Sequence, residues 1–177
     1  MSDVNDEIPT FGESLYRCEV NENAQANTPL NFIDGDIKHY VFDHDLGNNG
    51  TFRLFLDPLN DIFEIVPDIA VNEASFMIRV KNPKSLDYEQ LKEINFTLFA
   101  REVDEPSRYS SAHVQIFIRD QNDNFPEFTQ SVYNVSVAEN SEMGTSIAKL
   151  EAYDEDSGDF GTMGIRYKNL RGGIANL

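Results

Sequence analysis

The sequence predicts an all-β protein, folded as an antiparallel β-sandwich. Alternation of apolar and polar residues with a period of two recurs along the chain, as in Ile94–Leu98, while helical periodicity is nearly missing. Turn-forming pairs such as Asp57-Pro58 and Asn82-Pro83 separate the alternating runs. The expected strands are Leu15–Val20, Lys38–Phe42, Thr51–Leu56, Ile62–Val66, Phe76–Lys81, Ile94–Arg101 and His113–Arg119. Seven short strands within about 110 residues are typical of a β-sandwich.

The charge of the chain indicates which partners it can bind. Acidic residues outnumber basic ones by 31 to 14, and the formal net charge is −17. This excess argues against nucleic-acid binding, because Lys and Arg must supply the attraction to phosphates. The acidic residues form short clusters between the apolar strands, and this pattern favours sites that collect hard cations over a disordered acidic tail.

Cysteine and hydropathy give less information about the compartment. Cys18 is the single cysteine, so no disulfide forms within the chain, and its alternation with Tyr16 and Val20 predicts a buried thiol. No apolar run approaches the roughly 20 residues of a membrane helix. No signal peptide is visible, and Met1-Ser2 resembles a translation start joined to an interior fragment.

An internal repeat organises the acidic residues. Three landmarks recur in the same order: an acidic segment before Pro and Phe, a Glu-Asn pair after a strand, and an Asp-x-Asp. They are Asp3–Phe11, Glu22-Asn23 and Asp43-His44-Asp45 in the first copy, and Asp120–Phe128, Glu139-Asn140 and Asp154-Glu155-Asp156 in the second. The second copy reaches Leu177 after about half the residues of the first. We therefore expect it to contain only early strands, around Tyr133–Val137, Ile147–Ala152 and Ile165–Lys168.

The segment before Pro126 has the chemistry of a calcium site. Asp120, Asn122, Asp123 and Asn124 place four oxygen-bearing side chains within five residues. Carboxylates this close repel one another unless a cation neutralises them, and calcium accepts six to eight oxygen ligands. An EF-hand does not fit, because the glycines after both Asp-x-Asp segments fall one position early and no helices flank them.

These motifs resemble those of cadherin ectodomain repeats. Asp120-Gln121-Asn122-Asp123-Asn124 matches the cadherin linker motif, Glu22 matches the base glutamate, Leu86–Glu89 resembles the Asp-Arg-Glu motif, and Asp154-x-Asp156 matches the Asp-x-Asp. The resemblance implies seven-stranded, Greek-key, immunoglobulin-like sandwiches in tandem. It divides the chain into a linker from a missing preceding repeat (1–10), a complete repeat (11–119), a calcium-binding linker (120–124) and the N-terminal half of a second repeat (125–177).

The resemblance also implies a ligand set for three calcium ions. Two sites would use Glu22, Asp87, Glu89, Asp120, Asp123 and the carbonyl of Gln121, and the third would use Asn122, the carbonyl of Asn124, Asp154 and Asp156. Asp3, Asn5, Asp6, Asp43, Asp45 and Glu102 would form an upstream half-site at best. Glu102 stands where the family usually has Asp, and Glu7 stands where the linker motif ends in Asn.

The implied function is calcium-dependent cell adhesion. Bound calcium would rigidify the tandem on the extracellular face of the plasma membrane, where the parent protein would be anchored by a transmembrane segment outside this sequence. The implied partners are adjacent repeats and a homophilic or heterophilic cadherin on another cell. The chain has no Trp, so it lacks the strand-exchange anchor of classical cadherins, which favours an interior or nonclassical repeat.

The alternatives to adhesion are a receptor and an enzyme. A receptor whose sandwich faces dock a foreign ligand stays open, because such faces carry no motif. Catalysis by paired carboxylates is not expected, since no nucleophile–base pair or substrate cleft is indicated.

Three glycosylation sequons, at Asn49, Asn95 and Asn134, fit a secreted context.

Overall fold

A computed structural model describes residues 4–35 and 39–168, and the chain divides into two compact units, Met1–Asp120 and Gln121–Leu177. The strands of the first unit are β1 (Thr10–Phe11), β2 (Leu15–Asn21), β3 (Asn31–Phe32), β4 (Tyr40–Phe42), β5 (Thr51–Leu56), β6 (Phe63–Val66), β7 (Ile69–Val71), β8 (Glu73–Ser75), β9 (Met77–Val80), β10 (Glu93–Glu102) and β11 (Tyr109–Arg119). The second unit has β12 (Glu127–Phe128) and β13 (Ala152–Tyr153). Three short 3-10 helices complete the described elements: η1 (Gly47–Gly50), η2 (Pro83–Ser85) and η3 (Thr162–Gly164).

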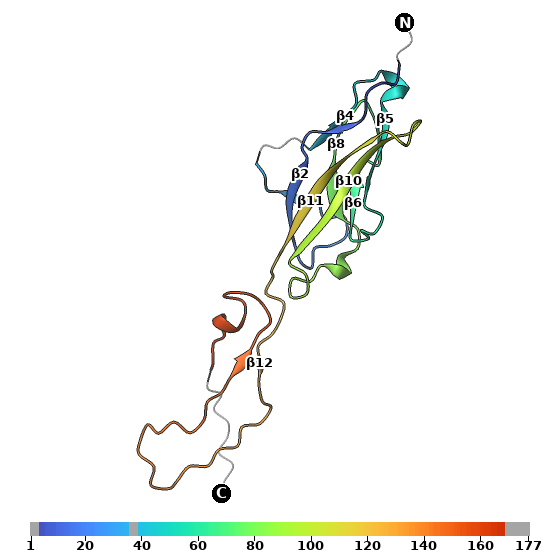
Figure 1. Ribbon diagram of the computed structural model, residues 1–177. Coiled ribbons are helices and arrows are strands. Elements are labelled where there is room, and N and C mark those ends of the chain that lie inside the picture. Colours follow the sequence, from blue (N-terminus) through green and yellow to red (C-terminus); the bar gives the residue numbers. More distant parts are fainter. Residues whose placement is uncertain (1–3, 36–38, 169–177) are drawn as a thin grey trace. The chain divides into compact units, whose positions relative to one another are not determined.

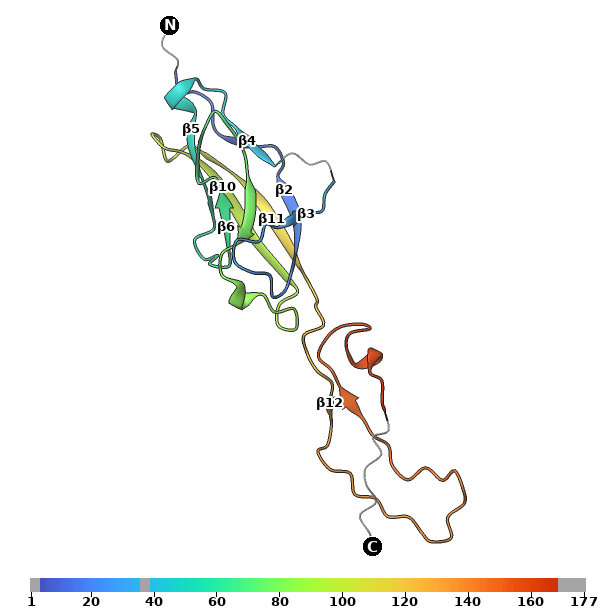
Figure 2. The ribbon, with the colours of Figure 1, turned by 180° about the vertical axis from the view of Figure 1, so that it is seen from behind.

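The first unit is a β-sandwich, as the alternation predicts (Figures 1 and 2). One sheet has six strands in the order β3-β2-β11-β10-β5-β7, in which β2 and β11 run parallel and the other neighbours run antiparallel. The facing elements are the three-stranded sheet β1-β4-β8 and the pair β6-β9. Within the described residues, no helix is long and apolar enough to cross a membrane.

Both sheets contribute to one apolar core. Tyr16, Leu98 and Ile116 of the six-stranded sheet are fully buried, and so are Val41 and Ile78 from the opposite strands. The period of two explains this, because every second side chain of β2, β10 and β11 points into the sandwich. The core holds the strand ends in fixed positions, and the acidic loops extend from those ends.

The predicted strands of the first unit form, with small shifts at their ends. Thr51–Leu56 has the expected bounds, whereas the strand predicted over Ile62–Val66 begins at Phe63 and the one over Phe76–Lys81 becomes Met77–Val80. The start of Lys38–Phe42 lies outside the described residues. Four short strands were not predicted, namely β1, β3, β7 and β8. Each has only two or three residues, too few to show an alternation in the sequence.

The strands predicted for the second unit are largely wrong. Tyr133–Val137 and Ile165–Lys168 are not strands, and of Ile147–Ala152 only Ala152 is paired, in the antiparallel pair β12–β13. Apolar side chains here stay at the surface, with Val132 65% and Ile147 55% exposed. Alternating residues become a strand only where a neighbouring strand accepts their backbone hydrogen bonds, and the described part of this unit offers only the β12–β13 pair.

Candidate metal centre

Three carboxylates gather at the end of β2 in the first unit. One oxygen each from Glu22, Asp87 and Glu89 lies within 4.8 Å of the others. Glu22 follows β2 directly and is only 2% exposed. Asp87 and Glu89 come from the loop after η2. These are three of the residues that the resemblance to cadherin repeats implies as calcium ligands, and the fold places a residue after β2 beside two residues some 65 positions later.

Backbone hydrogen bonds hold the two loops in this arrangement. The amide of Tyr88 donates to Glu22 Oε2 at 2.7 Å, and the amide of Asn23 donates to the carbonyl of Leu86 at 3.4 Å. Leu86 is buried in the core and anchors the loop. Asn23 adopts a left-handed conformation (φ 57°), which Asn tolerates better than most residues and which turns the chain immediately after Glu22.

Asp120 lies at the same end of the unit. It follows Arg119, the last residue of β11, whose carbonyl accepts a hydrogen bond of 3.0 Å from the amide of Glu22. β11 is parallel to β2, so the two strands end side by side with Arg119 opposite Asn21. The first unit thus brings together four of the predicted calcium ligands. They are Glu22, Asp87, Glu89 and Asp120.

The second unit gathers its own set of oxygen ligands. Asp154 and Asp156 are almost completely buried, at 4% and 6% exposed. Asn124 donates to Asp156 Oδ1 through its amide (3.2 Å) and its side chain (2.7 Å), and Asp154 Oδ1 accepts from the amide of Asp156 at 3.2 Å. Asn122 is exposed. Among the described residues, no hydrogen-bond partner reaches the buried Asp156 Oδ2.

The loop after Asp156 is closed by a tight turn. Thr162 Oγ1 accepts from the amide of Asp154 (2.9 Å) and donates to its carbonyl (3.0 Å). A side chain at Gly161 would place its Cβ 1.8 Å from the Asp156 carbonyl oxygen, so this position requires glycine. The turn fixes the two aspartates in adjacent, buried positions, and the unpartnered Asp156 Oδ2 suits a cation.

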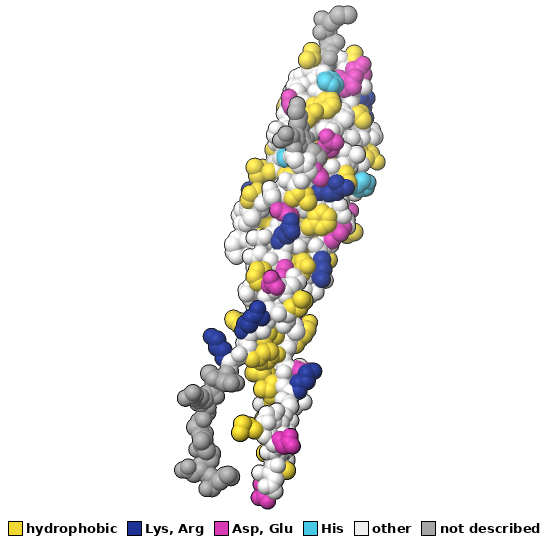
Figure 3. All heavy atoms as spheres, turned by 90° about the vertical axis from the view of Figure 1, so that its left-hand side faces the viewer, with side chains coloured by type: hydrophobic (Ala, Val, Ile, Leu, Met, Phe, Trp, Pro, Cys, Tyr) yellow, Lys and Arg dark blue, Asp and Glu magenta, His cyan; other side chains and the backbone are white. Residues whose placement is uncertain are grey.

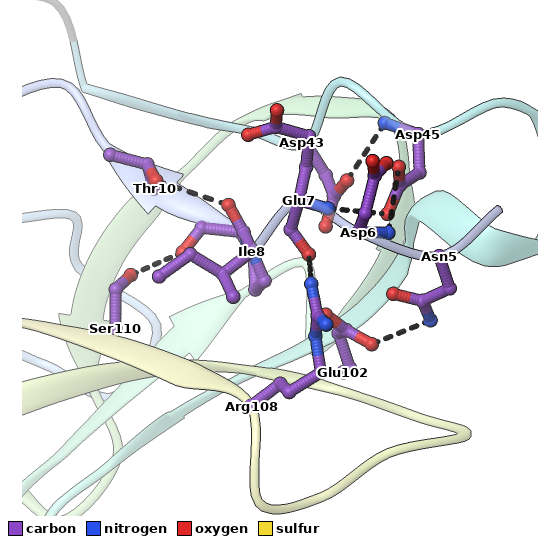
Figure 4. Close-up of polar contacts among 11 residues, drawn as sticks. Asn5, Asp6, Glu7, Ile8, Thr10, Asp43, Asp45, Glu102, Arg108 and Ser110 are labelled. Atoms are coloured by element: carbon purple, nitrogen blue, oxygen red, sulfur yellow. Dashed lines mark hydrogen bonds and ion pairs between the residues drawn. The ribbon is translucent and has the colours of Figure 1, made fainter.

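A third group of polar residues surrounds the N-terminal linker of the first unit (Figure 4). Asp45 accepts hydrogen bonds from the amides of Asp6 (3.4 Å) and Glu7 (3.2 Å), and its own amide donates to Asp43 Oδ1 at 3.0 Å. Burial raises the pKa of the Asp43 carboxyl above its usual range, opposed by the hydrogen bond from Asp45. Asn5 Nδ2 donates to Glu102 Oε2 at 2.7 Å. Asp3 lies outside the described residues.

Comparison with known proteins gives the family. No protein-family model matches the sequence. Cadherin-86C of Drosophila melanogaster is 39% identical over 165 residues, covering 93% of this chain and 8% of that protein. Cadherin-related family member 1 of Bos taurus is 37% identical over 161 residues, covering 90% of this chain and 19% of that protein. The crystal structure of mouse Cadherin-23 EC22-24 matches with a TM-score of 0.71 and 28% identity over 90% of this chain and 47% of that one.

The chain belongs to the cadherin superfamily. Its first unit has the immunoglobulin-like β-sandwich of cadherin ectodomain repeats. The chain spans less than a fifth of the length of the two curated relatives. Activities and partners of those whole proteins therefore enter only as proposals.

The acidic residues of this cadherin chain are not collected in one surface patch on the face shown in Figure 3. There, Asp and Glu side chains are interspersed with basic and hydrophobic ones. The carboxylates that group together are instead among the most buried polar residues, including Glu22, Asp43, Asp45, Glu102, Asp154 and Asp156. Buried carboxylates need compensation by donors or cations, so the clusters, not the total charge, indicate metal binding.

Two residues near the N-terminal linker of the cadherin repeat were not predicted from sequence. Arg108 Nε lies 2.8 Å from Glu102 Oε1, and a second guanidinium nitrogen donates to the carbonyl of Glu7. Asn72 Nδ2 donates to the carbonyl of Asp45. The turn signal at Glu105-Pro106 could have located Arg108, because a hairpin there places it opposite Glu102, whose amide donates to the Arg108 carbonyl at 3.1 Å.

The three sequons differ in their accessibility. Asn95, on β10, and Asn134 are exposed, whereas Asn49 lies within η1 and is partly buried. Asn95 Nδ2 also donates to Glu93 Oε1 at 2.7 Å, a surface contact that a glycan can displace. Glycosylation at Asn95 and Asn134 remains a prediction that the exposure of both side chains favours.

Proposed function

We propose that this chain is a calcium-binding part of a cell-adhesion ectodomain, in which ions held at the 120–124 linker stiffen the connection between two cadherin repeats. The observation that carries the proposal is the approach of Glu22, Asp87 and Glu89 to within 4.8 Å of one another. Three carboxylates at this separation are unfavourable without a cation.

The ligand chemistry supports calcium in particular. The predicted ligands are carboxylates, amide side chains and backbone carbonyls, and none of the three histidines or the single cysteine is among them. Calcium accepts irregular shells of six to eight oxygens, whereas magnesium requires a tight octahedron and keeps much of its water. Zinc prefers nitrogen and sulfur ligands.

The charges of the ligands also match the proposed number of ions. Seven carboxylates are proposed to take part, namely Glu22, Asp87, Glu89, Asp120, Asp123, Asp154 and Asp156. Their seven negative charges are nearly balanced by the six positive charges of the three ions that the family resemblance implies. Without ions the residual repulsion favours separation of the two units, so calcium converts a flexible joint into a stiff one.

The proposed role is mechanical, and it places the parent protein on the cell exterior. Stiff joints let a tandem of repeats span the space between cells and transmit force to an adhesive partner. The partner is proposed to be another cadherin, of the same or a different kind. Bead aggregation by the complete ectodomain, with and without calcium, separates adhesion from a receptor that docks a foreign ligand.

Calcium titration of two matched variants tests the proposed site. Asp123 and Asp6 occupy equivalent positions in the two copies of the linker motif. In this chain only Asp123 has proposed ligands on both sides of its linker. We expect isothermal titration calorimetry to show a larger loss of calcium affinity for Asp123→Ala than for Asp6→Ala. Equal losses would mean that the functional site has been misplaced.

A further inference from the structure

The polar group around the N-terminal linker differs from its counterpart in the second unit. We define the upstream cluster as Asn5, the carbonyl of Glu7, Asp43, Asp45 and Glu102, shown in Figure 4. The internal repeat relates four of these groups to Asn122, the carbonyl of Asn124, Asp154 and Asp156. The three carboxylates of the upstream cluster are almost completely buried, with Asp43 4% and both Asp45 and Glu102 2% exposed.

The upstream cluster already contains a cation. Arg108 binds two of its members at once, Glu102 Oε1 through Nε at 2.8 Å and the Glu7 carbonyl through a terminal guanidinium nitrogen. The carboxylate of this pair is only 1% exposed. The hairpin between β10 and β11 fixes the position of the arginine, because the Arg108 amide donates to the Glu105 carbonyl at 2.9 Å.

Protein donors satisfy nearly all carboxylate oxygens of the upstream cluster. Asn5 donates to the second oxygen of Glu102, the amides of Asp6 and Glu7 donate to the two oxygens of Asp45, and the Asp45 amide donates to Asp43 Oδ1. Among the described residues, the buried side-chain oxygens of this cluster that have no hydrogen-bond partner are Asp43 Oδ2 and Asn5 Oδ1. By comparison with three bare carboxylates, the arginine reduces the charge of the cluster from −3 to −2.

We propose that Arg108 is a built-in cation of the upstream cluster, which fastens the linker over residues 5–9 to the repeat without requiring an ion there. The same linker is tied further along by Ser110 Oγ, which donates to the carbonyl of Pro9. This inference concerns a different linker from the proposed function and does not depend on it.

Weak calcium binding at this cluster follows from the charge and the geometry. A guanidinium keeps its proton at any physiological pH, so its positive charge cannot be removed to admit an ion. A calcium ion that used Glu102 and the Glu7 carbonyl would have to displace both contacts of the arginine and would be repelled by its charge. We expect these effects to weaken calcium binding by about tenfold or more relative to a cluster without the arginine.

A calcium titration of the full chain, followed by NMR, tests this proposal. The amides of Glu7 and Asp45 report on the upstream cluster because each is a donor within it. The amide of Asn124, which donates to Asp156, reports on the 120–124 linker in the same samples. Failure of the proposed function would appear only in the second signal, so the two proposals can be distinguished.

Three variants and one control complete the experiment. Arg108→Gln should move the half-saturation of the Glu7 and Asp45 signals to about tenfold lower calcium, and Glu102→Asp should move it in the same direction by releasing the arginine. Arg108→Lys keeps the charge and should bind calcium weakly, like the unmodified chain. Arg79→Gln removes a similar pair (Arg79 Nε–Glu64 Oε1, 2.6 Å) on β6 and β9 and should leave the titration unchanged.

The half-saturation values of the variants show whether Arg108 takes the place of an ion. Equal half-saturation in the unmodified chain and in Arg108→Gln would overturn the proposal, and weaker binding in the variant would show that Arg108 supports an ion site. If Arg108→Gln does not fold, the Glu102→Asp variant tests the proposal instead. Unchanged calcium binding in Glu102→Asp would also contradict the role of Arg108 as a built-in cation.

Discussion

Replacing Glu22 by Gln should change the stability of the first unit in opposite directions with and without calcium. The substitution removes one of three carboxylate charges that lie within 4.8 Å of one another. It preserves the shape of the side chain and an oxygen that can accept the hydrogen bond from Tyr88. The electrostatic effect can therefore be separated from loss of packing.

The magnitude without calcium follows from Coulomb repulsion. At 4.8 Å each pair of charges repels by about 0.9 kcal/mol in bulk water and about 3.5 kcal/mol at an effective dielectric constant of 20. Glu22 takes part in two such pairs. After screening by salt, relief of about 1–2 kcal/mol is expected. This corresponds to a rise in melting temperature of roughly 4–8 °C for a domain of this size.

With calcium the sign reverses, because Glu22 is a proposed ligand. Loss of a group that merely orients a metal ligand typically weakens binding 10- to 100-fold, and loss of the ligand itself should cost at least as much. A tenfold loss removes about 1.4 kcal/mol of calcium-linked stabilisation per ion. We therefore expect Glu22→Gln to melt several degrees below the unmodified chain in saturating calcium.

Thermal melting followed by circular dichroism, in calcium and in chelator, measures both effects. Glu64→Gln is the matched control, since it removes a half-exposed glutamate paired with Arg79 and should have a small effect of the same sign in both conditions. A Glu22→Gln variant that is destabilised equally in calcium and in chelator would refute the reasoning, because the carboxylate would then be acting through structure alone.

Four further predictions concern the effect of calcium on stability, the second unit and the buried thiol. Calcium should raise the melting temperature of the unmodified chain and magnesium should raise it much less, and identical melting curves in calcium and chelator would contradict a calcium-stabilised joint. Hydrogen exchange should be slower in 94–119 than in 132–168, where apolar side chains are exposed, and equal protection would show that the second unit is self-sufficient. Cys18 is 0% exposed and burial raises the pKa of its thiol to about 12, so Ellman's reagent at pH 8 should label it only on unfolding, and rapid labelling of the native chain would contradict this. Because the folded chain keeps this proton after the unfolded chain has released it, the free energy of unfolding should also fall as the pH rises above about 8.5.

The sequence predicted the strands where alternation and a buried partner coincide. Thr51–Leu56 alternates clearly and pairs with β10, so its bounds were predicted correctly. Thr10–Phe11 was missed because its strand character comes only from pairing with Val41 and Phe42. Tyr133–Val137 shows the opposite case, since it alternates as a strand should but has no neighbouring strand among the described residues.

The candidate site, like the fold, could be predicted from the sequence only in part. The resemblance to cadherin repeats implied that Glu22, Asp87 and Glu89 share an ion, and the structure brings their carboxylates together because these residues follow a strand end or a turn at the same end of the sandwich. No ligand motif contains the contact between Glu102 and Arg108, and only the turn signal at Glu105-Pro106 indicates that the two residues lie opposite each other. The contact depends on the register of the β10–β11 hairpin and on the extra methylene of Glu relative to Asp.

Nitrogen-15 relaxation of the full chain tests most directly the claim that calcium stiffens the joint at 120–124. It reports the rotational correlation time of the ordered amides in each of the two units, and it can be measured in saturating calcium and in chelator. The account predicts one common correlation time with calcium and two different, shorter ones without it. Correlation times that are the same in both conditions would contradict it.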